Sequence, residues 1–174
     1  MKWALLMLAL PMAGQDLGAT LAAASRDSIK YVGYEVPMQP GQGTICSNWS
    51  GGFTSRQTKL KLDGPTRLKI LFRVDHGQVD KILLASDDCE IDAGNQTLVM
   101  LNGITPAASI AYLSGRDDDS SLYAISLHKD PKAAQQLIAM ARDGKNTRRQ
   151  KKAFFWLARS KDAQAEQFIE KILR

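Results

Sequence analysis

Four carboxylates surround one of the two cysteines of this 174-residue chain. Asp87 and Asp88 are on the N-terminal side of Cys89, and Glu90 and Asp92 are on its C-terminal side. If the segment is extended, Asp88, Glu90 and Asp92 share one face. Carboxylates grouped in this way suit cation binding or paired acid–base work. Because acidic residues more often hydrate loops and cap turns, a hydrolase-like envelope enzyme with its site at this cluster is our alternative expectation.

Other signs of catalysis are weak. The sequence contains no Walker loop, no G-x-G-x-x-G, no G-x-S-x-G and no H-E-x-x-H motif. Asp75 and His76 could be imagined as part of a catalytic triad, but the turn chemistry of residues 75–78 explains both of them. We therefore expect no catalytic residues, no cofactor and no enzymatic activity.

The N-terminus has the features of an export signal. Lys2 supplies a positive charge, and the apolar run 3–10 has the length of a signal h-region but is too short to span a bilayer. Small residues follow at 13–14, and 22–24 offer a later cleavage site. We expect residues 1–14 to be a signal peptide, and the mature protein to be periplasmic or secreted with no transmembrane segment. A buried N-terminal helix is the alternative.

Export favours a disulfide between Cys46 and Cys89, because paired cysteines are commoner than free ones in an oxidising compartment. In the chain-entropy model, closing a loop of this length stabilises the fold by about 4 kcal/mol. Two buried free thiols are the alternative. A zinc site needs four ligands, and the only histidines are His76 and His128, so we expect no metal site.

The formal net charge of +5 is unevenly distributed. Segment 140–161 holds eight basic residues and one acidic residue, which gives a local charge of +7. The commonest role of such a segment is a solvated helix face with snorkelling side chains. Among functional roles, export favours an acidic protein partner or an anionic envelope surface over nucleic acid. The residues that we predict to bind an acidic partner are Lys145, Arg148, Arg149, Lys151 and Lys152.

The first part of the chain has strand periodicity. With 44% hydrophobic and 24% charged residues, the composition is that of a globular protein. We expect a short helix at 16–24 and then a small, mainly antiparallel β region, so that residues 15–104 form one unit. The predicted strands are 29–36, 59–62, 67–74, 79–85 and 98–101. Strands 67–74 and 79–85 are predicted to form a hairpin through the turn 75–78.

The chain then changes to helical periodicity, and residues 105–174 are predicted to form helices. Polar residues mark the starts of these helices: Thr105, the acidic run 117–119, Asp130, Asn146 or Thr147, and Asp162. The acidic run lacks the spacing of a calcium loop and complements a helix N-terminus. Segment 153–158 is apolar nearly all round, which predicts a buried helix. The predicted helical core includes Leu137, Trp156, Leu157, Ala165, Phe168, Ile169 and Ile172.

This helical part repeats itself. Residues 129–137 and 161–169 align at an offset of 32 residues, with a second amphipathic segment between them. A helix, a turn, a second helix and then the first helix again is typical of stacked helical repeats. Such arrays bury one face against a neighbour and present the other to a partner.

Three stretches resemble exported bacterial proteins that are described only as HEAT-repeat-domain proteins. They are 31–37 followed by Cys46, 86–94 leading to 101–106 and Ser109, and 153–158; Asn95 stands where that pattern has a second glycine. The resemblance implies a HEAT-like helical array with an interaction role and brings no catalytic residues. The overall expectation is an α+β protein, a small antiparallel β region followed by a C-terminal HEAT-like α-hairpin array, that acts as an exported, non-catalytic interaction module.

Overall fold

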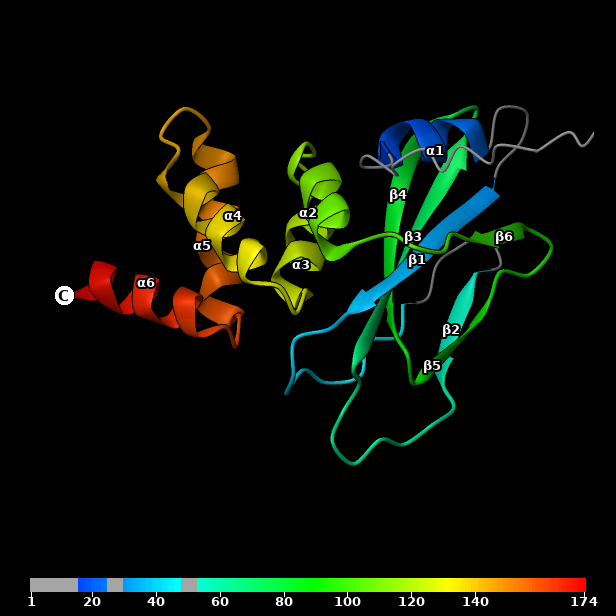
Figure 1. Cartoon of the computed structure of the whole chain (residues 1–174), viewed down its shortest axis with the longest axis horizontal. Coiled ribbons are helices and arrows are strands. Elements are labelled where there is room, and N and C mark those ends of the chain that lie inside the picture. The colour runs from blue at the N-terminus through cyan, green and yellow to red at the C-terminus, as the bar shows by residue number, and fades with distance from the viewer. Residues whose placement is uncertain (1–15, 25–29, 48–52) are drawn as a thin grey trace, which may run out of the picture.

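The computed structural model describes residues 16–24, 30–47 and 53–174 of the chain. Within these ranges a short helix precedes six strands and five further helices (Figure 1), which confirms the predicted α+β class. The predicted signal peptide, residues 1–14, lies outside the described residues. The elements are α1 (Leu17–Ala24), β1 (Lys30–Pro37), β2 (Thr54–Gln57), β3 (Arg67–Asp75), β4 (Gln78–Ser86), β5 (Cys89–Asp92), β6 (Thr97–Met100), α2 (Pro106–Ser114), α3 (Asp119–Leu127), α4 (Pro131–Arg142), α5 (Thr147–Arg159) and α6 (Ala163–Leu173).

The main sheet has four strands in the order β4–β3–β1–β6. β3 pairs antiparallel with both β1 and β4, whereas β6 runs parallel to β1. The prediction of an antiparallel β region is therefore wrong for β6, and the sheet is mixed. The reason lies in the connection, because the chain forms β5 outside this sheet before it reaches the free edge of β1.

The predicted hairpin is confirmed. β3 and β4 are joined through His76 and Gly77, which both have positive φ angles, 48° and 76°. Two consecutive left-handed residues give a tight turn whose twist matches that of the flanking strands, and glycine adopts this conformation without strain. The Asp75–His76 pair is therefore part of a turn, as its composition predicted.

One face of the sheet forms the main core with the helices. Alternate residues of the strands point to this face, and α1 adds Leu17 and Leu21. The same core continues into the C-terminal helices through Leu122, Leu137 and Leu157. The predicted units 15–104 and 105–174 thus share one hydrophobic core. The sheet residues in it are Val32, Tyr34, Val36, Leu68, Ile70, Phe72, Val74, Ile82 and Leu84.

The opposite face of the sheet is covered by a two-stranded antiparallel ribbon, β2–β5, which we did not predict. Phe53, just before β2, places its ring 4.9 Å from that of Tyr31, and both belong to a small second core with Leu71 and Leu83. Each strand of the ribbon has only four residues, which is too few to show a clear alternation in the sequence.

The predicted strand 59–62 is wrong, because these residues belong to the loop between β2 and β3. Its two leucines, Leu60 and Leu62, are 84% and 94% exposed. The backbone N–H of Lys59 donates to the carbonyl oxygen of Asp88, and that of Gly64 donates to the carbonyl oxygen of Lys61. Loop and turn hydrogen bonds therefore replace the ladder that the alternating pattern indicated.

The five C-terminal helices begin where we predicted. Each N-cap side chain accepts a hydrogen bond from a backbone N–H of the first turn, which satisfies a donor that the helix leaves unpaired. The caps are Thr105, Asp118, Asp130, Asn146 and Asp162. In Figure 1, α4, α5 and α6 lie beyond α2 and α3, on the side away from the sheet. No helix in the described ranges is long and apolar enough to cross a membrane.

Helix α5 is less buried than we predicted. Only Ala153 and Leu157 of this helix are buried, while Phe155 is 53% exposed. The rest of the predicted helical core divides in the same way: Leu137, Ala165 and Phe168 are buried, Trp156 and Ile169 are partly buried, and Ile172 is exposed. The reason is that α5 packs against α3, α4 and α6 with one side and leaves the other side to solvent.

Candidate functional site

The two cysteines form a disulfide, with their Cα atoms 5.8 Å apart. The prediction is confirmed, and the alternative of two free thiols is wrong. The bond joins the loop after β1 to the start of β5. Ser86 strengthens the same junction, since its hydroxyl accepts from the backbone N–H of Ile45 at 2.8 Å. Lys69 donates from Nζ to the carbonyl oxygen of Cys89 at 2.8 Å.

Asp88 supports this junction from within. It is buried, and its carboxylate accepts hydrogen bonds from Thr44 and Ser86, each at 2.5 Å, and from Gln57 at 3.2 Å. Burial raises the pKa of Asp88, but the hydrogen bonds outweigh burial, so this pKa lies below its usual range. Asp88 therefore stays ionised and holds two loops together.

Asp87, in the same turn as Asp88, has a similar role towards the loop between β2 and β3. Its carboxylate lies 2.5 Å from Nζ of Lys61 and accepts from the backbone N–H and the hydroxyl of Thr66. Burial raises the pKa of Asp87, but these bonds, with the Lys61 contact first among them, bring it below its usual range. A general acid needs a raised pKa, so neither Asp87 nor Asp88 is suited to that role.

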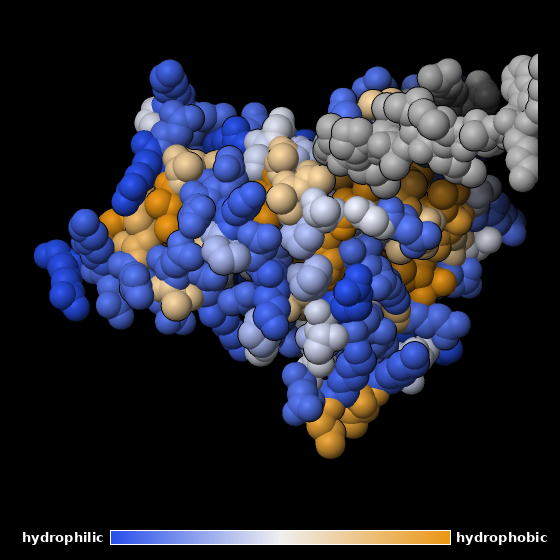
Figure 2. All heavy atoms as spheres, in the orientation of Figure 1, coloured by the Kyte–Doolittle hydropathy of each residue, from blue (hydrophilic) through white to orange (hydrophobic). Residues whose placement is uncertain are grey.

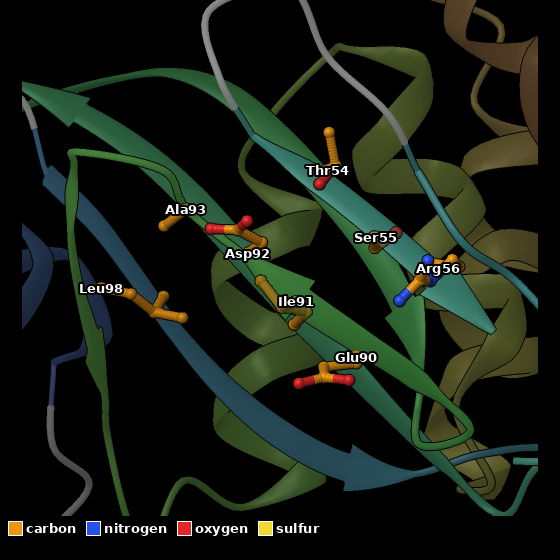
Figure 3. A pocket seen from close by; sticks show the side chains of 8 residues that line it. All are labelled: Thr54, Ser55, Arg56, Glu90, Ile91, Asp92, Ala93 and Leu98. Atoms are coloured by element: carbon orange, nitrogen blue, oxygen red, sulfur yellow. The ribbon is translucent and has the colours of Figure 1, made fainter. Parts of the chain in front are cut away.

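The other two carboxylates lie elsewhere. Glu90 and Asp92 are exposed on β5 and line an open concavity of about 850 Å³ with Thr54 and Arg56 of β2. Figure 3 shows these four side chains on the ribbon, with Leu98 of β6 on the far side of the concavity. The structure thus divides the predicted cluster, because only two of its four carboxylates face this space.

The predicted basic residues also divide into two groups. Lys145, Arg148 and Lys151 are exposed. The side chains of Arg149 and Lys152 are only 23% and 17% exposed, and each faces a carboxylate at or just before the start of α3. Asp117 lies 3.4 Å from Nε of Arg149, and Asp119 lies 2.8 Å from Nζ of Lys152. The expectation of a solvated helix face is therefore wrong for Arg149 and Lys152.

The exposed cations continue along the outer side of α5. Arg148, Lys151, Phe155 and Arg159 are spaced by three or four residues, which places them on one face of the helix. The guanidinium of Arg159 lies over the Phe155 ring, 5.4 Å from its centroid. We call these four residues the outer stripe of α5. The stripe combines positive charge with an exposed aromatic ring, and we had predicted that ring to be buried.

A buried polar network joins the sheet to the helices, and sequence analysis missed it. Nδ1 of His128 lies 2.7 Å from the carbonyl oxygen of Ala124, which can only accept, so Nδ1 carries the proton. Nε2 then accepts from Ser109 Oγ at 2.8 Å, and that oxygen accepts from the Tyr34 hydroxyl at 2.7 Å. Burial lowers the pKa of His128 to about 4 and raises that of Tyr34.

The network has residue types used in nucleophilic catalysis, but its three side chains are buried. His128 is 2% exposed, and Ser109 and Tyr34 are completely buried. These residues are 75 and 19 positions apart in the chain, so no local motif could indicate their contact. The other histidine, His76, is 79% exposed and contacts Asp75 of the same turn at 2.5 Å. His76 is thus explained by its turn, and His128 by the buried network.

No group of three or more His, Cys, Asp or Glu side chains in the described part of the chain is arranged to hold a metal ion. Comparison of the chain with protein-family models, with curated proteins and with solved structures found no match. The HEAT-repeat resemblance therefore stays a prediction, and the case for a function depends on the geometry described above.

Proposed function

We propose that this protein is an exported, non-catalytic interaction module that binds an acidic protein partner in the cell envelope. The observation that carries the proposal is the outer stripe of α5. An aromatic ring that is 53% exposed and lies among cations is typical of an interface, where aromatic and arginine side chains contribute most of the binding energy. The surrounding charge steers an acidic partner towards it.

The helical part supports this role as a short HEAT-like array. Helices α4 and α6 repeat at 32 residues, and each begins at an aspartate N-cap, Asp130 and Asp162. Helix α5 lies between them in the chain and packs against both. In such arrays one helix face builds the core and the other remains for partners. The outer stripe of α5 occupies the second kind of face.

Export is part of the proposal. The disulfide is compatible with an oxidising compartment. Lys2 and the apolar run 3–10 supply the signal. Intact-mass measurement of the protein from its native host should show that at least the first dozen or so residues are missing. Full-length protein in the cytoplasm would contradict export.

The binding proposal is tested by crosslinked capture from the native envelope. Arg148→Glu together with Lys151→Glu should abolish capture of the partner and leave the melting temperature unchanged, because both side chains are exposed. Lys129→Glu with Lys132→Glu is the matched control, since it reverses the same number of exposed charges on a different surface. Capture by the unsubstituted chain should weaken as salt rises, because charge attraction is screened within about 8 Å at physiological ionic strength. Equal capture by the charge-reversed and control proteins would show that the outer stripe of α5 only keeps the protein in solution and does not bind the partner.

The second candidate is the hydrolase-like enzyme, and one observation favours it: Glu90 and Asp92 face the same concavity as Arg56. Two carboxylates and a guanidinium at one site are compatible with acid–base work on a polar substrate. Asp92→Asn and Glu90→Gln are nearly isosteric. If envelope material is hydrolysed by the wild-type protein and not by these variants, the enzyme proposal replaces the binding proposal.

A further inference from the structure

The loop between β2 and β3, residues 58–66, projects from the molecule with an apolar tip. Leu60 and Leu62 are almost fully exposed, whereas the other leucines of the described ranges, except Leu173, are buried or partly buried. The loop lies at the lower end of Figure 1, and Figure 2 shows an apolar patch at the tip of the same projection. A patch formed by neighbouring exposed leucines is a feature that soluble surfaces usually avoid.

The loop is held in this conformation by the backbone carbonyl group of Asp88 and the carboxylate of Asp87. The backbone N–H groups of Thr58 and Lys59 donate to the carbonyl oxygen of Asp88 at 3.0 and 3.4 Å. Lys61 is fixed by its ion pair with Asp87, and its carbonyl oxygen accepts from Gly64 at 3.0 Å. Both ends of the loop are therefore anchored next to the disulfide, and the leucines are displayed by a fixed backbone.

The chemistry of the tip favours a lipid bilayer as the surface that covers it. The tip is convex, so a protein partner would need a matching groove, whereas lipid tails and headgroups can adapt to the shape of a small projection. Residues 56–66 also contain three basic side chains and one acidic side chain, Asp63. Of these, Arg56 and Lys59 are exposed and available to lipid phosphates.

We propose that this loop inserts Leu60 and Leu62 into the interface of an anionic phospholipid bilayer, with Lys59 and Arg56 at the level of the headgroups. The contact would be peripheral and reversible, as expected when only two apolar side chains enter the bilayer. It is independent of the proposed partner-binding face, because it uses a different surface.

Vesicle sedimentation tests the proposal with the chain as isolated from its host. Vesicles of roughly three parts phosphatidylcholine to one part phosphatidylglycerol should bind the protein, and phosphatidylcholine alone should bind it more weakly. Leu60→Ser with Leu62→Ser should lower the partition coefficient by roughly tenfold for each leucine, because burying a leucine is worth at least a factor of this size. Leu173→Ser, at an exposed leucine outside the loop, is the matched control and should bind like the unsubstituted chain.

A tryptophan reporter separates insertion of the loop from adsorption by any other part of the chain. Leu62→Trp should show a blue-shifted emission, relative to the unsubstituted chain, when anionic vesicles are added, and Leu173→Trp should show no such shift. No binding of the unsubstituted chain, or equal binding by the double serine variant together with an unshifted Leu62→Trp emission, would overturn the proposal. The proposal would also be overturned if the loop leucines became buried against the captured protein partner and not in vesicles, because the loop would then bind a protein.

Discussion

Between pH 7 and pH 5, acidification should destabilise this protein mainly through one side chain, His128. In the folded state its Nδ1 donates to Ala124 and its Nε2 accepts from Ser109 in a site closed to water. Protonation would place a hydrogen on Nε2, which would then point at the Ser109 hydroxyl that now donates to it. The added charge would also be buried. The folded protein therefore favours the neutral imidazole.

The size of the effect follows from the two pKa values of His128. Burial lowers the folded-state pKa to about 4, against 6.5 for an ordinary histidine. Because the folded pKa is the lower one, the stabilising contribution is complete above pH 6.5 and is lost as the pH falls towards 4. Each pKa unit corresponds to about 1.4 kcal/mol, so the loss between pH 7 and pH 5 should be about 2 kcal/mol.

Urea unfolding followed by circular dichroism measures this loss, with the disulfide kept intact. Measurements between pH 7 and pH 5 stay above the range in which carboxylates titrate. His128→Gln keeps a donor and an acceptor but does not titrate, so the histidine contribution to the pH dependence should disappear. His76→Gln is the matched control, since His76 is exposed and is the only other histidine in the chain.

Two results would refute the reasoning. The first is the same pH dependence of unfolding free energy in His128→Gln as in the wild-type protein. The second is an NMR titration of His128 in the native wild-type protein that gives a pKa near 6.5. The second measurement needs no substitution, so it remains decisive if the variant folds poorly.

Three further predictions concern stability. Replacing Cys46 and Cys89 with serine should lower the free energy of unfolding by about 4 kcal/mol in urea titrations; an unchanged value would show that the disulfide contributes nothing to stability. Gly33→Ala should lower the melting temperature markedly, because a Cβ there would lie 2.3 Å from a leucine side chain of β3; an unchanged melting temperature would contradict the strand packing. Trp156→Ala should cost about 2 kcal/mol, less than a fully buried ring, because this partly buried ring stacks 4.3 Å from a tyrosine of α3. Phe155→Ala should cost much less. Equal losses of unfolding free energy from the two changes would show that Phe155 does not lie on an exposed face of α5.

The elements that could be predicted are those whose signals are local. The β3–β4 hairpin has long strands around a turn, and the helix starts are marked by capping residues such as Asp130 and Asp162. The pairing of β6 with β1 could not be predicted in this way, because strand partners far apart in the chain leave no local pattern. The same holds for the contact between Ser109 and His128. The alternating residues 59–62 misled us, because alternation predicts a strand only when a partner strand is present.

The candidate site was only partly predictable for a related reason. Residue types identified the disulfide and the acidic cluster, but the roles of the four carboxylates depend on their neighbours. Asp87 and Asp88 accept hydrogen bonds from donors on two loops, the one after β1 and the one between β2 and β3, and so support the structure. Glu90 and Asp92, on the exposed side of a ribbon that we did not predict, are the two that face open space.

The basic segment shows how sequence charge overstates the charge that a partner meets. Segment 140–161 has a net charge of +7, but Arg149 and Lys152 face Asp117 and Asp119. Fewer cations are therefore left to attract a partner, and part of the binding energy must come from the aromatic ring of Phe155. Burial of apolar area is not screened by salt, whereas charge attraction is. Binding through the outer stripe should consequently weaken with salt to a residual level, and Phe155→Ala should remove that residual level. Complete loss of capture at moderate salt in the unsubstituted protein would show instead that the cations act without the ring.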